Sequence, residues 1–209
     1  ISTTVSRIEK NKIKKLYNQE TLLYPNAISL KNTVKGQILL KDYIIYSGSY
    51  LYKPNKDAVD YINNMIMPDL LKKYPNMKLV LTGGGFDKKL PWVINKGIVK
   101  KNILHNLVYY SKCMCVPLKF GSGTRIKIIE AMALGTIVVS TSKGIEGIDL
   151  KKKNPPFIAN DRKMIIKAIL EVIKHNKKIK IKAVKQKSYY QKKFDMKNIT
   201  RNFIKEALN

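Results

Sequence analysis

Acidic residues are scarce in this sequence. Its 209 residues include 14 Asp and Glu against 41 Lys and Arg, which gives a formal net charge of +27. Only four of the basic residues are arginines, and the lysines are spread along the whole chain. This pattern is typical of a solvated lysine-rich surface, and the shortage of acids leaves an anionic partner as the alternative. Because the lysines are not grouped with aromatic residues at a stacking site, a basic nucleic-acid-binding module is the less favoured form of that alternative.

Cysteines, histidines and long apolar runs are scarce as well. Cys113 and Cys115 stand two residues apart in one apolar run, which excludes a disulfide framework and favours a reducing, cytoplasmic compartment. His105 and His175 have no second histidine or acid at metal-ligand spacing, so we expect no metal ion and no cofactor. No apolar run approaches the roughly 20 residues that cross a bilayer, and the 44% of hydrophobic residues can form a core.

Short apolar runs alternate with helical patterns along the chain. Each run is continuously apolar and rich in β-branched and aromatic residues. Such strands lie in a parallel sheet that helices cover on both faces, so we expect a doubly wound, Rossmann-like α/β domain. The predicted strands are 42–47, 78–82, 113–118, 136–140 and 155–159. The predicted helices are 57–74, kinked at Pro68, and 104–110, 121–135, 161–175, 179–191 and 196–208.

The chain divides into three parts by composition. Residues 1–28 hold spaced apolar positions among lysines and end near a Pro-Asn turn, so we expect a linker with a helix. Residues 29–176 carry the α/β pattern, and residues 177–209 form basic helices. The stretch 174–193 has nine lysines and no acid. It is either a solvated helix face or a patch that meets an anionic membrane surface.

Glycine-rich turns follow three of the predicted strands, at 48–49, 83–85 and 121–123. In doubly wound folds, ligands bind outside the carboxyl ends of the strands, where such turns lead into helices. The third turn opens a predicted helix, whose N-terminus offers unpaired N–H groups and the positive end of a dipole to an anion. Arg125 and Lys127 place cations where the helix dipole favours acids, and a bound diphosphate would resolve that conflict.

Glu130 lies seven residues after Gly123 and three after Lys127, on the same side of the predicted helix as Lys127. Seven helical residues span about 10 Å, roughly the distance from a β-phosphate to the ribose hydroxyls of a nucleoside diphosphate. A carboxylate accepts two ribose O–H groups, as it does in dinucleotide-binding folds. The alternative is a solvent-exposed ion pair between Lys127 and Glu130 on an ordinary amphipathic helix.

Three segments of the chain resemble one protein family. The segment GSGTRIKIIEAMALGTIVVSTSKGIEGID, residues 121–149, resembles the nucleotide-sugar-binding half of retaining group 1 glycosyltransferases with the GT-B fold. The segment YSGSYLYKPNKDAVDYI, residues 46–62, resembles the first strand, loop and helix of that half, and YPNAI, residues 24–28, resembles its opening Pro-Asn-Gly signature. The resemblance covers residues 24–175 in order. It implies that residues 29–176 are the nucleotide-sugar-binding domain, the C-terminal half of a GT-B fold.

This resemblance implies a function. The chain would bind a UDP- or GDP-sugar as substrate and take part in sugar transfer, without a metal ion, to a glycan or lipid-linked acceptor, as in polysaccharide biosynthesis. An N-terminal acceptor-binding domain is missing, so the chain alone would bind nucleotide and turn over little or nothing. A lipid-linked acceptor would agree with a peripheral position at the inner face of the membrane. Within the same fold, the alternative is a UDP-sugar epimerase-like domain.

The resemblance also implies roles for single residues. Arg125 and Lys127 would stabilise the leaving diphosphate, and Glu130, which matches the second Glu of the Glu-x7-Glu motif, would hold the ribose. Ser122 stands where that motif has its first Glu, and the Arg and Lys that usually follow the first strand are absent after Gly48. Segment 98–104 would hold the base. The remaining donor contacts would be Gly48, Ser49, Gly121, Ser122, Gly123 and Thr124.

Overall fold

The computed structural model describes residues 2–30, 39–150 and 156–208. Within these residues, a central six-stranded sheet has the order β5-β4-β3-β6-β7-β8, and all neighbouring strands are parallel. The strands are β3 (Tyr43–Ser47), β4 (Lys78–Thr82), β5 (Val93–Asn95), β6 (Met114–Val116), β7 (Val138–Ser140) and β8 (Phe157–Ile158). The predicted α/β class is confirmed. Of these six strands, β5 was not predicted, because it is a three-residue edge strand without buried residues.

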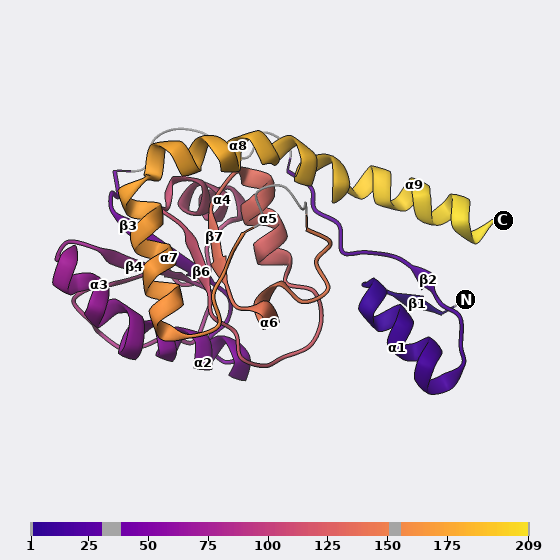
Figure 1. Cartoon of the computed structure of the whole chain (residues 1–209), viewed down its shortest axis with the longest axis horizontal. Coiled ribbons are helices and arrows are strands. Elements are labelled where there is room, and N and C mark those ends of the chain that lie inside the picture. Colours follow the sequence, from indigo (N-terminus) through magenta and orange to yellow (C-terminus); the bar gives the residue numbers. More distant parts are fainter. Residues whose placement is uncertain (1, 31–38, 151–155, 209) are drawn as a thin grey trace.

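Helices cover both faces of this sheet (Figure 1). On one face α4 (Lys101–Tyr110) packs against α5 (Ile126–Leu134), and α8 (Asn176–Lys193) packs across α5. The other face carries α2 (Lys53–Tyr61), α3 (Met67–Lys73) and α7 (Arg162–Lys174), which packs against α3. This arrangement follows from right-handed crossovers between parallel strands. From β3 the chain builds the sheet toward one edge, with α2 and α3 on one face, and from β5 it returns through α4 to β6 and builds toward the other edge, with α4 and α5 on the opposite face.

The predicted helix 57–74 is one helical run from α2 through a π-helical turn, η1 (Ile62–Ile66), into α3. It begins earlier than predicted, at Lys53, because Pro54 at the second helical position suits the first turn of a helix. The irregularity expected at Pro68 takes the form of η1, which ends two residues before this proline. Proline has no N–H to donate to the preceding turn, and a widened turn is a known way to accommodate this loss.

The start of the helix predicted at 121–135 is wrong. α5 begins at Ile126, and residues 121–124 form a loop instead of the first helical turn. Gly121 and Gly123 have φ values of 112° and 78°, which lie outside the right-handed helical region and exclude a helix here. Gly135 ends the helix in the left-handed conformation, as predicted for a glycine at that end.

The two ends of the chain lie away from the sheet (Figure 1). The N-terminal segment folds as β1 (Thr3–Thr4), α1 (Arg7–Tyr17) and β2 (Leu22–Leu23), where a helix or linker was predicted, and β1 pairs with β2 in parallel. α8 continues into α9 (Met196–Ala207), which packs against β2. A short helix after β7, α6 (Ser142–Ile145), was not predicted. The predicted C-terminal helices are confirmed as α7, α8 and α9.

The core lies between the sheet and its helices. Side chains on both faces of the central strands have no exposed surface, among them Ile44, Ile45 and Val80. Cys113 and Cys115 belong to this core as buried free thiols. Burial raises the pKa of Cys113 to about 12, so this thiol is neutral at physiological pH.

Gly83, directly after β4, allows the loop after β4 to lie close to the loop after β3, and its substitution tests the fold. Its φ is +111°, and a Cβ there would lie 2.5 Å from the carbonyl carbon and oxygen of Gly48. We expect Gly83→Ala to lower the free energy of unfolding by about 2 kcal/mol or more, because a strained backbone conformation costs roughly 1–3 kcal/mol before any clash. Urea unfolding followed by circular dichroism measures the loss.

Gly84→Ala is the matched control for this substitution. A Cβ at Gly84 would meet the Ile98 side chain at 3.6 Å, an ordinary van der Waals distance. We expect a change within about 0.5 kcal/mol. Equal losses in the two variants would contradict the close approach of the two loops.

Candidate functional site

A cavity of about 290 Å³ opens at the carboxyl ends of β3 and β6. These strands are neighbours at the centre of the sheet, where the strand order changes direction. In doubly wound folds this switch point is where ligands bind. The loop and helix after β3 contribute Gly48, Tyr52, Pro54 and Asn55 to the lining, and the loop and helix after β6 contribute Leu118, Gly121, Ser122, Thr124, Arg125, Ile126 and Lys127.

The two helices that line the cavity have open N-termini. α2 and α5, which line the cavity, and α4, which packs against α5, have neither a side-chain cap nor an acid in the first turn. By contrast, Ser6, Thr141, Asp161 and Asp195 cap α1, α6, α7 and α9. The unpaired N–H groups of α2 and α5 and their positive dipole ends therefore remain available to an anion in the cavity.

Arg125 is the N-cap residue of α5 and not, as predicted, part of its first turn. Its guanidinium donates hydrogen bonds to the carbonyl oxygens of Gly123 and, at 3.1 Å, Gly121. The side chain is buried beneath the loop that it holds. Arg125 therefore organises the glycine loop and adds a fixed positive charge to the cavity wall.

Lys127 is partly buried in the first turn of α5 and points toward β3 and α2. Its ammonium donates to Asn55 Oδ1 at 2.9 Å and to Tyr46 Oη at 3.1 Å, and lies 4.2 Å from the centre of the Tyr46 ring. Burial, with a smaller effect from the charge of Arg125, lowers the pKa of Lys127 to about 7. No carboxylate pairs with Lys127 among the residues that the structure describes, so an added anion would stabilise its charged form.

Asn55 and Tyr46 were not predicted as site residues. Tyr46 Oη donates to Asn55 Oδ1 at 2.7 Å, and Asn55 Nδ2 donates to the carbonyl of Ser49 at 2.9 Å. Ser49 itself does not line the cavity. A Cβ on Gly48 would lie 2.7 Å from Asn55 Nδ2 and 2.8 Å from Lys127 Nζ, so the glycine is required for this network. The position of Asn55, soon after the first glycine turn, was the signal that could have identified it.

Glu130 faces α4 instead of the cavity lined by Lys127. Its Oε1 lies 3.4 Å from Lys101 Nζ and 3.8 Å from His105 Nε2, and 17% of its side chain is exposed. Burial would raise the pKa of Glu130, but the neighbouring His105 and Lys101 outweigh burial and hold it below its ordinary value. The alternative of an exposed Lys127–Glu130 pair is not realised, because the two side chains contact different elements.

The rest of the glycine loop is open. Ser122 and Gly123 are exposed, and Thr124 is partly buried. The Thr124 hydroxyl oxygen is buried without a hydrogen-bond partner, as is that of Thr82 at the end of β4. Thr124 also lines a second cavity of about 510 Å³, which the N-terminal segment, residues 147–149 and α9 enclose. The two cavities therefore adjoin at this residue.

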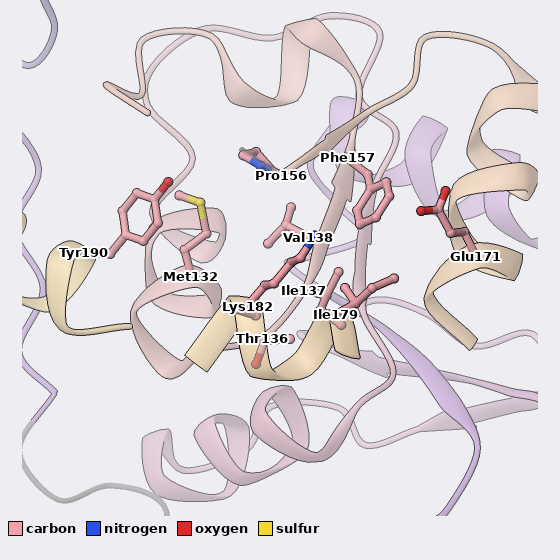
Figure 2. A pocket seen from close by; sticks show the side chains of 11 residues that line it. Met132, Thr136, Ile137, Val138, Pro156, Phe157, Glu171, Ile179, Lys182 and Tyr190 are labelled. Carbon is pink, nitrogen blue, oxygen red and sulfur yellow. The ribbon is translucent and has the colours of Figure 1, made fainter. Parts of the chain in front are cut away.

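A third cavity, of about 160 Å³, lies elsewhere in the molecule (Figure 2). It is lined by residues before β7 and on α8, mostly apolar, such as Ile137 and Ile179. Because Thr136 and Ile137 precede β7, this cavity opens at the amino end of the sheet, opposite the glycine loops. None of the predicted site residues lines it.

Among the described residues, no group of three or more His, Cys, Asp and Glu side chains is arranged to hold a metal ion. None of the helices described is both long enough and apolar enough to cross a membrane.

Sequence comparison finds a family and a relative. The family described as Glycosyl transferases group 1 matches residues 41–175. An uncharacterized 44.6 kDa protein in the cps region of Klebsiella pneumoniae is 25% identical in an alignment 177 residues long, which covers 78% of this chain and 45% of that protein.

Solved structures share the fold. Sucrose-phosphate synthase from Thermosynechococcus elongatus matches with a TM-score of 0.77 and 14% identity, over 98% of this chain and 57% of that one. HepE from Anabaena, in complex with UDP and glucose, matches with a TM-score of 0.76 and 14% identity, over 99% and 62% of the chains. A mutant of S. aureus TarM, in complex with fondaparinux, alpha-GlcNAc-glycerol and UDP, matches with a TM-score of 0.73 and 12% identity, over 97% of this chain and 43% of that one.

These relatives are longer than the chain, which spans between 43% and 62% of their length. The family match itself covers more than half of the chain and includes β3 to β8, the glycine loops and α5. The chain therefore belongs to the group 1 glycosyl transferases.

Proposed function

We propose that this chain is the donor-binding half of a retaining glycosyltransferase that uses a UDP- or GDP-sugar. The observation that carries the proposal is the cavity at the switch point, where two uncapped helices meet Arg125 and Lys127 and no carboxylate lines the wall. Such a wall favours an anion with more than one charge, and a diphosphate meets that requirement. The family membership supports sugar transfer as the reaction.

In the proposed reaction, the bond between the anomeric carbon and the β-phosphate oxygen breaks, and the diphosphate keeps the electron pair. A bond to the acceptor hydroxyl oxygen forms on the same face, and the hydroxyl proton passes to the departing phosphate. Negative charge grows on the β-phosphate as it leaves. Arg125, Lys127 and the N–H groups of residues 121–124 would neutralise this charge without a metal ion, because they are fixed before the reaction begins.

Glu130 is proposed to hold the ribose. It is partly exposed, and Lys101, the first residue of α4, places it near the same end of the sheet as the cavity. Lys101 and His105 both approach Oε1, and the carboxylate has further lone pairs that can accept a hydroxyl. The base would then lie against segment 98–104, where Ile98 is 87% exposed.

The acceptor is proposed to bind on a second half that this chain does not contain. α1 has no buried residue, and its Leu16 and Tyr17 side chains are 60% and 73% exposed, so the N-terminal segment has apolar surface for such a half. The segment also borders the larger cavity, which adjoins the donor cavity at Thr124. The acceptor domain would cover this side of the molecule.

We further propose a glycan or lipid-linked acceptor, polysaccharide biosynthesis and a cytoplasmic location. The Klebsiella pneumoniae relative is named for a cps region, which agrees with polysaccharide synthesis. On α8, Lys177, Lys178, Lys182 and Lys185 are exposed around Ile181. An exposed apolar residue among lysines agrees with peripheral binding at an anionic membrane surface.

Titration of the chain with UDP, GDP, ADP and a short oligonucleotide at two salt concentrations tests the function. We expect saturable binding of UDP or GDP with little salt dependence. Steep salt dependence for the oligonucleotide, with no saturable nucleotide binding, would instead favour a nucleic-acid-binding module. Turnover of a UDP-sugar to its epimer by the chain would favour the epimerase alternative.

Arg125→Ala is expected to weaken UDP or GDP binding at least tenfold, because it removes a charge and releases the glycine loop. Arg125→Lys keeps the charge but cannot bridge two carbonyl groups in the same way, so its affinity should be intermediate. Calorimetric titration measures the affinities, and thermal melting verifies folding. Unchanged affinity in Arg125→Ala would remove this residue from the site.

Lys127 predicts a pH dependence of nucleotide binding. In the free chain its pKa is about 7, and a diphosphate beside it favours the ammonium form, so binding takes up a proton above pH 7. UDP affinity should therefore fall several-fold between pH 7.5 and 8.5, with tenfold as the limit for one proton. The phosphate ionises near pH 6, so its own charge stays constant over this range.

Lys127→Met should bind UDP more weakly at pH 7 and lose this slope. Lys73→Met, on the exposed end of α3, is the control and should keep both affinity and slope. A wild-type affinity that does not change with pH would show that Lys127 does not face the phosphates.

Glu130→Gln tests ribose recognition. Because a carboxylate accepts two hydroxyls, the wild type should bind UDP at least tenfold more tightly than 2′-deoxy-UDP. The variant should lose most of this preference while it keeps measurable affinity for both nucleotides. An unchanged preference would show that Glu130 does not contact the ribose.

A further inference from the structure

His105 is a buried polar residue that the mechanism above does not use. It lies on α4, its side chain has no exposed surface, and neither ring nitrogen has a hydrogen-bond partner. Buried polar atoms are nearly always hydrogen-bonded, and each exception needs a reason. The carboxylate that His105 faces is that of Glu130, with 3.8 Å between Nε2 and Oε1.

The distance of 3.8 Å is about 1 Å too long for a hydrogen bond. A small shift of the Glu130 side chain would bring Oε1 to Nε2 and satisfy both buried groups. The packing of α4 against α5 holds the two side chains close enough for this contact.

Lys101 approaches the same oxygen from the same face of α4, one turn earlier. Its side chain is 57% exposed, so water competes for the ammonium and the long side chain remains flexible. The His105 side chain is fully buried, so water does not compete for its ring nitrogens and packing fixes the ring. Lys101 and His105 both lie closest to Oε1 of Glu130, so Oε2 is the oxygen that these two groups leave for another donor.

We infer that His105 is a positioning residue that holds the Glu130 carboxylate through Oε1, so that Oε2 is presented to the vicinal hydroxyls of a ribose. This inference rests on the proposed function. His105 touches no part of the nucleotide and acts through Glu130. A carboxylate with one oxygen fixed has a defined direction, and it distinguishes ribose from deoxyribose better than a freely rotating one.

Calorimetric titration of the chain with UDP and 2′-deoxy-UDP tests the inference. His105→Ala should lower the preference for UDP at least fivefold, and His105→Gln, which keeps an N–H donor, should restore at least half of that loss. Ser111→Ala is the matched control, because Ser111 is a buried polar residue at the opposite end of α4 that donates to the carbonyl of Val108, and it should change the preference less than twofold. In the Glu130→Gln background, His105→Ala should have no further effect on the preference.

A purely structural role of His105 predicts a different result. His105→Ala would then weaken UDP and 2′-deoxy-UDP by the same factor, and His105→Gln would not restore the difference. Either that result, or a change of preference in the Glu130→Gln background, overturns the inference. Should thermal melting show that His105→Ala fails to fold, His105→Gln and His105→Asn replace it. The longer Gln side chain should reach Oε1 and keep the preference for UDP, whereas the shorter Asn side chain should lose it.

The wild-type titrations separate this inference from the proposed function. Absence of saturable UDP and GDP binding would reject both. Binding with the expected ribose preference, unaltered by every His105 variant, would reject the inference and leave the proposed function intact. Where GDP binds more tightly than UDP, GDP and 2′-deoxy-GDP replace the uracil nucleotides.

Discussion

Uncompensated positive charge at one edge of the sheet is the constraint on which the site depends. α2, α4 and α5 begin there without caps, and Lys127 is partly buried against an amide and a phenol instead of a carboxylate. Burying an ammonium in this way is unfavourable, and the lowered pKa of Lys127 expresses that cost. α6 and α7, which begin at the same sheet edge but do not line the cavity, have side-chain caps, as do α1 and α9. An anion at the edge would offset the cost where it arises.

The parallel topology brings the parts of this edge together. β3 and β6 are far apart in sequence and adjacent in the sheet, so the segment after Tyr46 meets the segment before Lys127. Glycines then set how closely the segments approach. Side chains at Gly48 and Gly83 would collide with the Lys127 ammonium and with the backbone of Gly48, respectively. The glycines that follow the strands therefore leave space in which the side chains of Asn55, on α2, and Lys127, on α5, meet.

Local sequence patterns were sufficient for the order and class of the elements, because continuously apolar strands and amphipathic helices are local signals. They also picked out the segment from Gly121 to Lys127, most of which lines one cavity. They failed at the start of α5, where positive φ angles at Gly121 and Gly123 delay the helix. They also missed Asn55 and His105, because the partners of these residues depend on strand order and helix packing, which no local pattern contains.

The position of one acid within so basic a chain gives the proposed site a direction. A net charge of +27 attracts any polyanion without orienting it, and salt screens that attraction beyond about 8 Å. Orientation requires groups of opposite character at fixed places. Lys127 and the open helix ends favour phosphate, whereas Glu130, kept ionised by its neighbours on α4, repels phosphate and accepts hydroxyls. In the proposed binding mode, these opposite charges orient the nucleotide with its phosphates toward the glycine loop and its ribose toward α4.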